Sequence, residues 1–214
     1  MRLVDKTWSE PVRDPSRRSA VLHLPFFESD AELVAAIRAG ERAAGAALYD
    51  RHHAYVRSVL TRVLGPDVDL RDLMQDVFVI AVDSIARLAD PNALRPWLAG
   101  ISVNCVRAEL RRRTRSGWSL FSVSELPQAA ATVHNPEIDE AVRATYRVLT
   151  RLSADERIPF ALRFIDGMEL LEVAVACGVS LATAKRRLAA ARKKFVSIAR
   201  TYPELSDWLR GAEQ

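Results

Sequence analysis

The most specific chemical signal in the sequence is a turn centred on Gly178 between two short helical patterns. The first pattern ends at Ala174, a residue small enough for two helices to cross closely, and Gly178 can adopt the positive φ that a tight turn needs. Ser180 can cap the helix that follows. This spacing predicts a helix-turn-helix in which Val179 and Leu188 face inward.

The outward face of the second of these helices is basic and polar. Short polar and cationic side chains at the start of a helix can reach base edges and phosphates in the major groove, and the positive end of the helix dipole adds a phosphate site. An ordinary helical hairpin with a solvated basic face has the same pattern. The candidate DNA-contacting residues are Ser180, Thr183, Lys185, Arg186 and Arg187, followed by Arg192, Lys193 and Lys194.

A second basic cluster lies at the middle of the chain. Five arginines fall within nine residues, with only Glu109 opposing them, and would repel one another unless a polyanion neutralised them. Cations at the C-terminal end of a helix are also favoured by the helix dipole. Two basic patches in separate segments suggest a protein that touches DNA at two places. This cluster consists of Arg107, Arg111, Arg112, Arg113 and Arg115.

An acidic face is expected on another helix. Asp69, Asp72 and Asp76 are spaced i, i+3 and i+7, and Gln75 lies beside them. A solvated surface would show the same pattern. The functional interpretation is a docking surface for a basic or polar partner, kept away from the arginines. The opposite face of this helix is expected to carry Leu73, Val77, Ile80, Ala81, Ser84 and Leu88.

The elements that must position these residues are all predicted to be helices. After a flexible extension over residues 1–28, Ser29 and Glu32 form a capping box. The helical pattern that follows is interrupted at Gly40 and ends at Gly65-Pro66. Further helices are expected over about 69–88 and 94–113, so the first domain spans 29–113.

A change in composition separates a second domain. Residues 114–137 are rich in Ser, Thr, Pro and Ala and predict a linker, although Trp118, Leu120, Phe121 and Val123 cluster within it. Four helices are expected over 138–200, followed by a tail over 201–214. Ser153 begins another capping box. Pro159 indicates either a helix that starts near Ile158 or one that is kinked. The fold class is therefore all-α, with two small helical domains joined by a flexible linker.

The composition and a few isolated residues argue against several other classes of protein. Hydrophobic residues make up 49% of 214 residues, which can supply a real core, and the formal charge is +4. No window approaches a transmembrane helix, and we expect a soluble cytoplasmic protein. Cys105 and Cys177 lack metal-ligand spacing and are expected to be buried and reduced. The adjacent His52 and His53 point about 100° apart on a helix and make a poor metal pair. We expect no cofactor, metal or catalysis.

These features in this order resemble the extracytoplasmic-function sigma factors. DAELVAAIRAGERAAGAALYDRHHAYV is similar to the first helices of the family's region 2. DLRDLMQDVFVIAVDSIARL resembles its polymerase-clamp-binding helix, and RPWLAGISVNCVRAELRRR its promoter-melting helix. LSADERIPFALRFIDGMELLEVAVACGVSLATAKRRLAAARKKF resembles region 4. The resemblance covers about 165 residues. It implies a transcription initiation factor that does no covalent chemistry.

The resemblance assigns roles to matching positions. Core RNA polymerase and promoter DNA are the implied partners, and an anti-sigma factor is a partner that the family often has. Ser180, Thr183, Lys185, Arg186 and Arg187 match the positions that contact the minus-thirty-five element. The positions that contact and open the minus-ten element match Asn92, Arg95, Asn104, Arg107, Arg111 and Arg112. The polymerase-binding positions match Asp72, Gln75, Asp76 and Phe78.

The sequence departs from the family pattern in places and leaves one alternative open. Ala184 stands where the family usually has a larger β-branched residue, and the turn before Trp97 lacks the common aromatic side chain. A stand-alone helix-turn-helix regulator, which binds a duplex operator without polymerase, is the alternative function. Binding of duplex DNA by the protein alone distinguishes the two.

Overall fold

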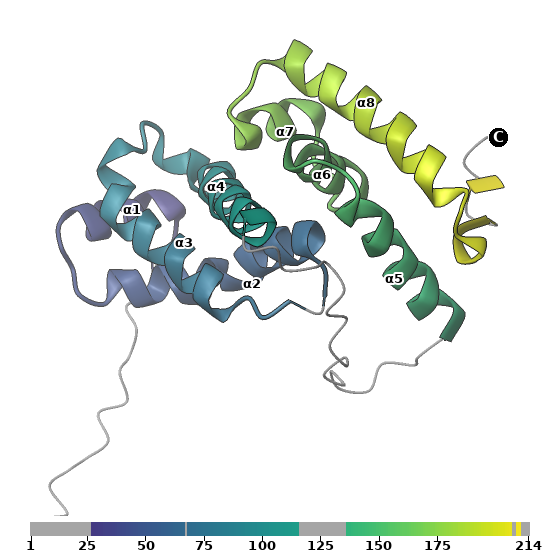
Figure 1. Cartoon of the computed structure of the whole chain (residues 1–214). Coiled ribbons are helices and arrows are strands. Elements are labelled where there is room, and N and C mark those ends of the chain that lie inside the picture. Colours follow the sequence, from purple (N-terminus) through teal and green to yellow (C-terminus); the bar gives the residue numbers. More distant parts are fainter. Residues whose placement is uncertain (1–26, 67, 116–135, 207–208, 211–214) are drawn as a thin grey trace, which may run out of the picture.

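The computed structural model describes residues 27–66, 68–115, 136–206 and 209–210, and all regular structure within them is helical. The expected linker cluster around Trp118 and most of the N-terminal extension lie outside these residues. Figure 1 shows two groups of helices packed side by side. The first domain contains α1 (Asp30–Arg38), α2 (Ala44–Leu64), α3 (Arg71–Ser84) and α4 (Leu94–Arg115).

The ends of α1 and α2 follow the sequence signals. Ser29 Oγ accepts a hydrogen bond from the Glu32 N–H, 3.2 Å away, at the start of α1. Gly40 has a φ of 78°, which breaks the helical run into α1 and α2 as predicted. Gly65 ends α2 with a φ of 108°. Phe27, which lies within the expected extension over 1–28, packs against the core of the first domain.

The second half of the first domain differs from expectation at one helix end. The predicted helix over 69–88 is α-helical only from Arg71 to Ser84 and continues as a 3-10 turn over Ile85–Arg87. A second 3-10 turn, Pro91–Ala93, leads into α4, where the Asp90 side chain accepts from the Asn92 N–H. Tightened turns of this kind are common at helix ends.

The second domain contains α5 (Pro136–Thr150), α6 (Ala154–Phe160), α7 (Leu170–Cys177) and α8 (Leu181–Ala199), followed by a 3-10 turn over Pro203–Leu205. The Ser153 capping box is present, so α6 begins at Ala154 and not near Ile158. Pro159 lies inside α6, and a π-helical turn, Ala161–Ile165, follows directly. Because proline has no N–H to donate, the regular α-helical ladder is broken at this point.

The two domains share one hydrophobic core. Helix α4 is buried on more than one side, because α2 and α3 cover one part of its surface and α7 covers another. Leu94, Leu98 and Val103 of α4 are fully buried in the same cluster as Ile158 and Val173 of the second domain. The second domain therefore completes the core of the first and does not stand apart from it.

Candidate functional site

The predicted helix-turn-helix is present, with a longer first helix than expected. Helix α7 continues beyond Ala174 to Cys177, and Gly178 follows it in the left-handed conformation with a φ of 66°. Ser180 caps α8, where its Oγ accepts from the Thr183 N–H, 3.2 Å away. The tight turn thus comes from a glycine without a Cβ penalty and from a hydroxyl that satisfies an orphan N–H of α8.

The basic side chains of α8 fall into two groups. Lys185 and Arg186 are exposed and form no ion pair with any described residue. Arg187 pairs with Asp155 of α6, Nη1 to Oδ1 3.1 Å, and Lys194 pairs with Glu156, Nζ to Oε2 3.1 Å. The first group is free to meet an anionic partner, whereas the second also connects α8 to α6.

The inner face of α8 packs as the sequence predicted. Leu188 is 8% exposed and Val179 is partly buried, so both help to fix the crossing of α7 and α8. Ala184 is fully buried. Its small side chain, at a position where a larger one was expected, therefore lies inside the domain and not on the exposed basic face of α8.

The candidate minus-ten residues lie on α4 and in the turn before it, but they do not share one face, because Arg95 and Asn104 are nine residues apart on the helix and point in opposite directions. Asn92 and Asn104 are exposed, and the Arg95 guanidinium lies 4.3 Å from the centroid of the Tyr55 ring. Arg107 donates from Nη1 to the Asn104 side-chain oxygen at 3.0 Å, and from Nη2 to the Cys177 carbonyl at 2.8 Å. Arg107 is therefore engaged with the second domain in this conformation.

The arginine cluster at the end of α4 is partly neutralised from within. Glu109 Oε2 lies 2.7 Å from Arg112 Nε, and Oε1 lies 2.6 Å from Arg113 Nε. Hydrogen bonds from Arg112, then from Arg113, lower the pKa of Glu109 to about 2. Arg111 is exposed and has no partner among the described residues, and the side chain of Arg115 lies outside them. The cluster keeps a net positive charge.

The acidic face of α3 is exposed and extends further than expected. Asp72, Gln75 and Asp76 make no hydrogen bond or ion pair within the described part of the chain. One turn farther along the same face, Val79 is 52% exposed and Ile80 is 43% exposed. Ile80 was expected in the core, so that prediction was wrong. Positions i+3, i+4, i+7 and i+8 from Asp72 lie on the same helix face, and this spacing identifies Val79 and Ile80 as surface residues.

Phe78 differs from the other candidate polymerase-binding residues. It is 8% exposed and packs against the Tyr49 ring, with a centroid separation of 4.9 Å. Phe78 is therefore part of the packing beneath α3. It can affect a docking surface only by fixing the position of that helix.

The described residues give little support for a metal site, a reactive cysteine or a membrane-spanning helix. They contain no group of three or more His, Cys, Asp or Glu side chains placed to hold a metal ion. Cys105 and Cys177 are buried free thiols, as predicted, and burial raises the pKa of both. None of the described helices is both long and apolar enough to cross a lipid bilayer.

Two family models match the chain, and together they cover more than half of it. Residues 48–116 match sigma-70 region 2, and residues 143–195 match sigma-70 region 4. The first match contains α3 and α4 with the acidic face and the arginine cluster at the end of α4. The second contains α7 and most of α8, with the helix-turn-helix. The two surfaces described above therefore fall in the two matched regions.

Curated relatives and a solved structure agree with these matches. The chain is 29% identical over 165 residues to RNA polymerase sigma factor NccH of Alcaligenes xylosoxydans xylosoxydans, covering 74% of this chain and 88% of NccH. It is 29% identical over 171 residues to ECF RNA polymerase sigma factor SigM of Mycobacterium tuberculosis, covering 79% and 84%.

The fold is also similar to that of CnrH in a complex with the cytosolic domain of CnrY. The TM-score is 0.56 at 24% identity, with 81% of this chain and 98% of that chain covered. At this identity the similarity concerns the fold alone. The paired matches to regions 2 and 4, the helical architecture and the relatives together identify the chain as a member of the extracytoplasmic-function sigma factor family, which directs RNA polymerase to promoters.

Proposed function

We propose that α8 of this cytoplasmic sigma factor contacts the minus-thirty-five element through Ser180, Thr183, Lys185, Arg186 and Arg187. The observation that supports this assignment best is the exposed pair Lys185 and Arg186, which lack ion pairs among the described residues at the capped start of the helix. Cations in this position can reach guanine edges and phosphates in the major groove.

Contact with the minus-ten element is assigned to α4 and the turn before it. Arg111 and Arg112 are exposed and suited to phosphates of a splayed strand, and Asn92, Arg95, Asn104 and Arg107 supply further polar groups on α4 and in the turn before it. Extruding a base from the duplex costs a few kcal/mol, which pocket contacts and arginines must offset. Arg107 must release Cys177 before it can take part.

The exposed face of α3 is assigned to the binding of core RNA polymerase. Asp72, Gln75 and Asp76 provide the acidic part of this face, and Val79 and Ile80 provide an apolar part that excludes water. Charged groups set orientation and association rate, while buried apolar groups supply affinity. An anti-sigma factor remains a proposed partner, in keeping with the CnrY domain bound to the structural neighbour CnrH.

A run-off transcription assay with purified core polymerase and promoter fragments tests the assignment. The wild-type chain should direct initiation from a defined start site, whereas core polymerase alone should not. Tight sequence-specific binding of duplex DNA by the chain without polymerase would favour a stand-alone regulator instead.

A further inference from the structure

Arg95 is an exposed cation at a helix position that electrostatics disfavour. It lies in the first turn of α4, and the N-terminal end of a helix carries a partial positive charge. The ion pairs among the described residues include none to Arg95. Neither a carboxylate within this part of the chain nor the helix dipole therefore holds the side chain in place.

The ring of Tyr55, on α2, provides a contact of another kind. The Arg95 guanidinium carbon lies over this ring, 4.3 Å from its centroid. Tyr55 is half-buried and packs against the core of the first domain, which fixes the position of the ring. The negative face of an aromatic ring attracts a cation at this distance, and the flat guanidinium group is well suited to such stacking.

The attraction comes from the ring and not from a phenolate charge. Burial raises the pKa of the Tyr55 hydroxyl, and this effect exceeds the opposing effect of Arg95, so Tyr55 is neutral at neutral pH. Asp166, a carboxylate that also acts on the pKa of Tyr55, pairs with Arg62, Oδ1 to Nε 3.4 Å. The contact between Arg95 and Tyr55 is therefore a cation–π interaction.

Stacking leaves the hydrogen-bonding groups of Arg95 available. The five N–H donors of a guanidinium lie in its plane and point outward from its edge, whereas the tyrosine contacts its face. The donors can therefore reach a base edge or a phosphate while the ring restricts the side-chain rotamers. Fixing a long side chain before binding removes part of the entropy cost of ordering it in the complex.

Asn92, three residues before Arg95, is also held before DNA arrives. Asp90 Oδ1 accepts from the Asn92 N–H at 2.9 Å and from the Asn92 side-chain amide at 3.2 Å. Two residues assigned to the minus-ten element are thus ordered in advance, one by a carboxylate of its own turn and the other by an aromatic ring of a different helix. All four residues lie in the first domain.

We propose that Tyr55 is a positioning residue for promoter opening, because its ring holds Arg95 in the orientation that contacts the minus-ten element. The proposal rests on the proposed assignment of Arg95 to that element. Tyr55 itself does not contact DNA and acts only through Arg95.

A double-mutant cycle on open-complex formation tests this proposal. The reconstituted holoenzyme is mixed with a promoter fragment that carries 2-aminopurine in the minus-ten element, and the fluorescence of this base rises when the strands separate. Tyr55→Leu and Tyr55→Met both remove the aromatic face with different packing, and Tyr55→Phe keeps that face and removes the hydroxyl. Arg95→Ala removes the cation. Core binding and the midpoint of thermal unfolding are measured for every variant.

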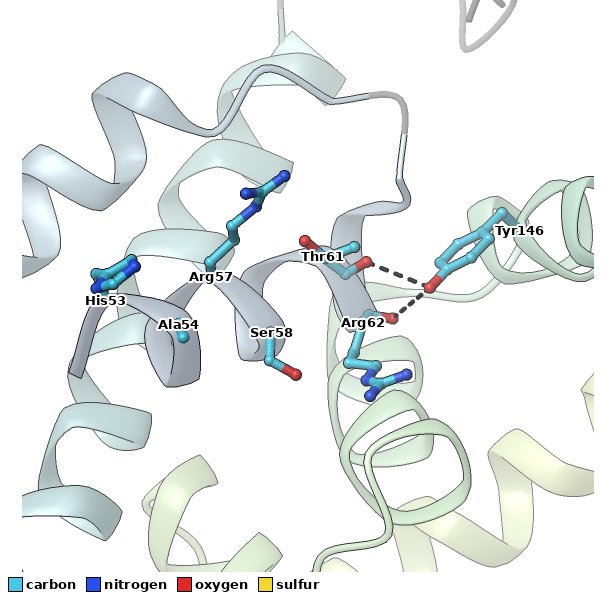
Figure 2. A pocket seen from close by; sticks show the side chains of 7 residues that line it. All are labelled: His53, Ala54, Arg57, Ser58, Thr61, Arg62 and Tyr146. Atoms are coloured by element: carbon cyan, nitrogen blue, oxygen red, sulfur yellow. Dashed lines mark hydrogen bonds between the residues drawn. The ribbon is translucent and has the colours of Figure 1, made fainter. Parts of the chain in front are cut away.

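The matched control is Arg57→Ala, which removes an exposed cation two residues farther along α2. Arg57 has no ion pair among the described residues and lies on a different face of the helix from Tyr55. There it lines a separate pocket together with His53 and Tyr146, as Figure 2 shows. This variant should open the promoter as fast as wild type.

Tyr55→Leu and Tyr55→Met should slow open-complex formation about three- to tenfold without loss of core binding. Tyr55→Phe should remain within about twofold of wild type, because a phenylalanine ring also attracts a cation. In the Arg95→Ala background neither non-aromatic substitution should cause a further loss, since the ring then has no cation to hold. A purely structural role of the ring would instead slow opening equally in both backgrounds.

Additive losses in the double variants would therefore overturn the proposal. So would non-aromatic variants that open the promoter at the wild-type rate while Arg95→Ala is slow, and in that case the assignment of Arg95 would stand. Normal opening by Arg95→Ala would reject that assignment, and the positioning role of Tyr55 with it.

Discussion

Arg187 of α8 is held by Asp155 of α6, with Nη1 3.1 Å from Oδ1, whereas the adjacent Arg186 is exposed and has no ion pair among the described residues. Consecutive residues on a helix point about 100° apart, so one arginine faces α6 and the other faces outward. Two neighbouring cations of the same helix therefore have different environments, and their substitution should have different consequences.

Arg186→Ala should weaken promoter-specific transcription and leave core binding intact. Loss of one contact to a base edge costs about 1–3 kcal/mol, and loss of one phosphate contact lowers the salt dependence of binding by about one unit of slope. Run-off transcription across a salt series with the reconstituted holoenzyme measures both effects. A holoenzyme that initiates as well as wild type would contradict the assignment of α8.

Arg187→Ala provides the comparison at the next position. Its ion pair with Asp155 is partly exposed, so its loss should change the free energy of unfolding by no more than about 1 kcal/mol. Urea denaturation of the free protein measures this change. A loss well above that value would mean that the pair contributes more to the domain than its exposure indicates, and Asp155→Ala should then show the same loss.

Asp76→Arg should reduce binding to core RNA polymerase by at least about tenfold and leave the helical content unchanged. The substitution reverses a charge at the centre of an exposed acidic face, where like charges oppose association. Pull-down with purified core polymerase provides the measurement. Glu41→Arg makes the same charge change at an exposed position between α1 and α2 and should bind normally. Equal binding by both variants would reject α3 as the docking surface.

Local signals in the sequence were sufficient to predict the helices and much of the candidate site. Capping residues and positive-φ glycines depend on the few residues around them, so Ser29, Gly40, Gly65 and Ser180 marked helix ends correctly. The helix-turn-helix was predictable for the same reason. Its first helix ends at Cys177, three residues beyond the predicted end at Ala174, because the left-handed Gly178 ends the helix there.

The contact between the domains was not predicted, because its partners are far apart in the sequence. Arg157 of α6 donates a hydrogen bond to the Val63 carbonyl of α2, yet the two residues are 94 positions apart, and nothing near either one indicates the other. One signal was available, since α4 carries buried apolar residues on several sides, including Leu98, Val103 and Val106. A helix whose buried apolar residues cover a wide arc of its surface requires cover from more than one side. The first domain alone does not supply that cover.

The stability of the first domain should fall as the pH is lowered through about 6.5. His52 is buried and its Nε2 lies 3.1 Å from Asp30 Oδ1. Burial lowers the pKa of His52 below its ordinary value of 6.5, and this effect exceeds the opposing attraction of Asp30. Below pH 6.5 the unfolded chain therefore binds a proton that the folded chain resists, and stability is lost.

Urea denaturation at pH 7.5, 6.5 and 5.5 measures this effect. His52→Gln should flatten the decrease between pH 6.5 and 5.5, while His53→Gln, at an exposed position, should leave it unchanged. An identical slope in wild type and His52→Gln would exclude His52 as the source of the pH dependence.

Ala184→Val should destabilise the second domain by about 1–3 kcal/mol, because the added methyl groups enter a fully buried position. The midpoint of thermal unfolding should fall accordingly. Ala182→Val places the same side chain at an exposed position of the same helix and controls for the lower helix propensity of valine. Equal stability of the two variants would mean that space for the larger side chain exists beside Ala184.

Arg157 Nε donates a hydrogen bond to the Val63 carbonyl at the end of α2, and this contact has a consequence for how the chain folds during synthesis. A ribosome completes α2 long before it adds the arginine that closes its last turn, because 94 positions separate Val63 from Arg157. During that interval the nascent first domain has a hydrated, frayed helix end and an uncovered side of α4. A fragment ending near residue 115 would keep both features permanently, and should be more prone to aggregate than the full-length chain.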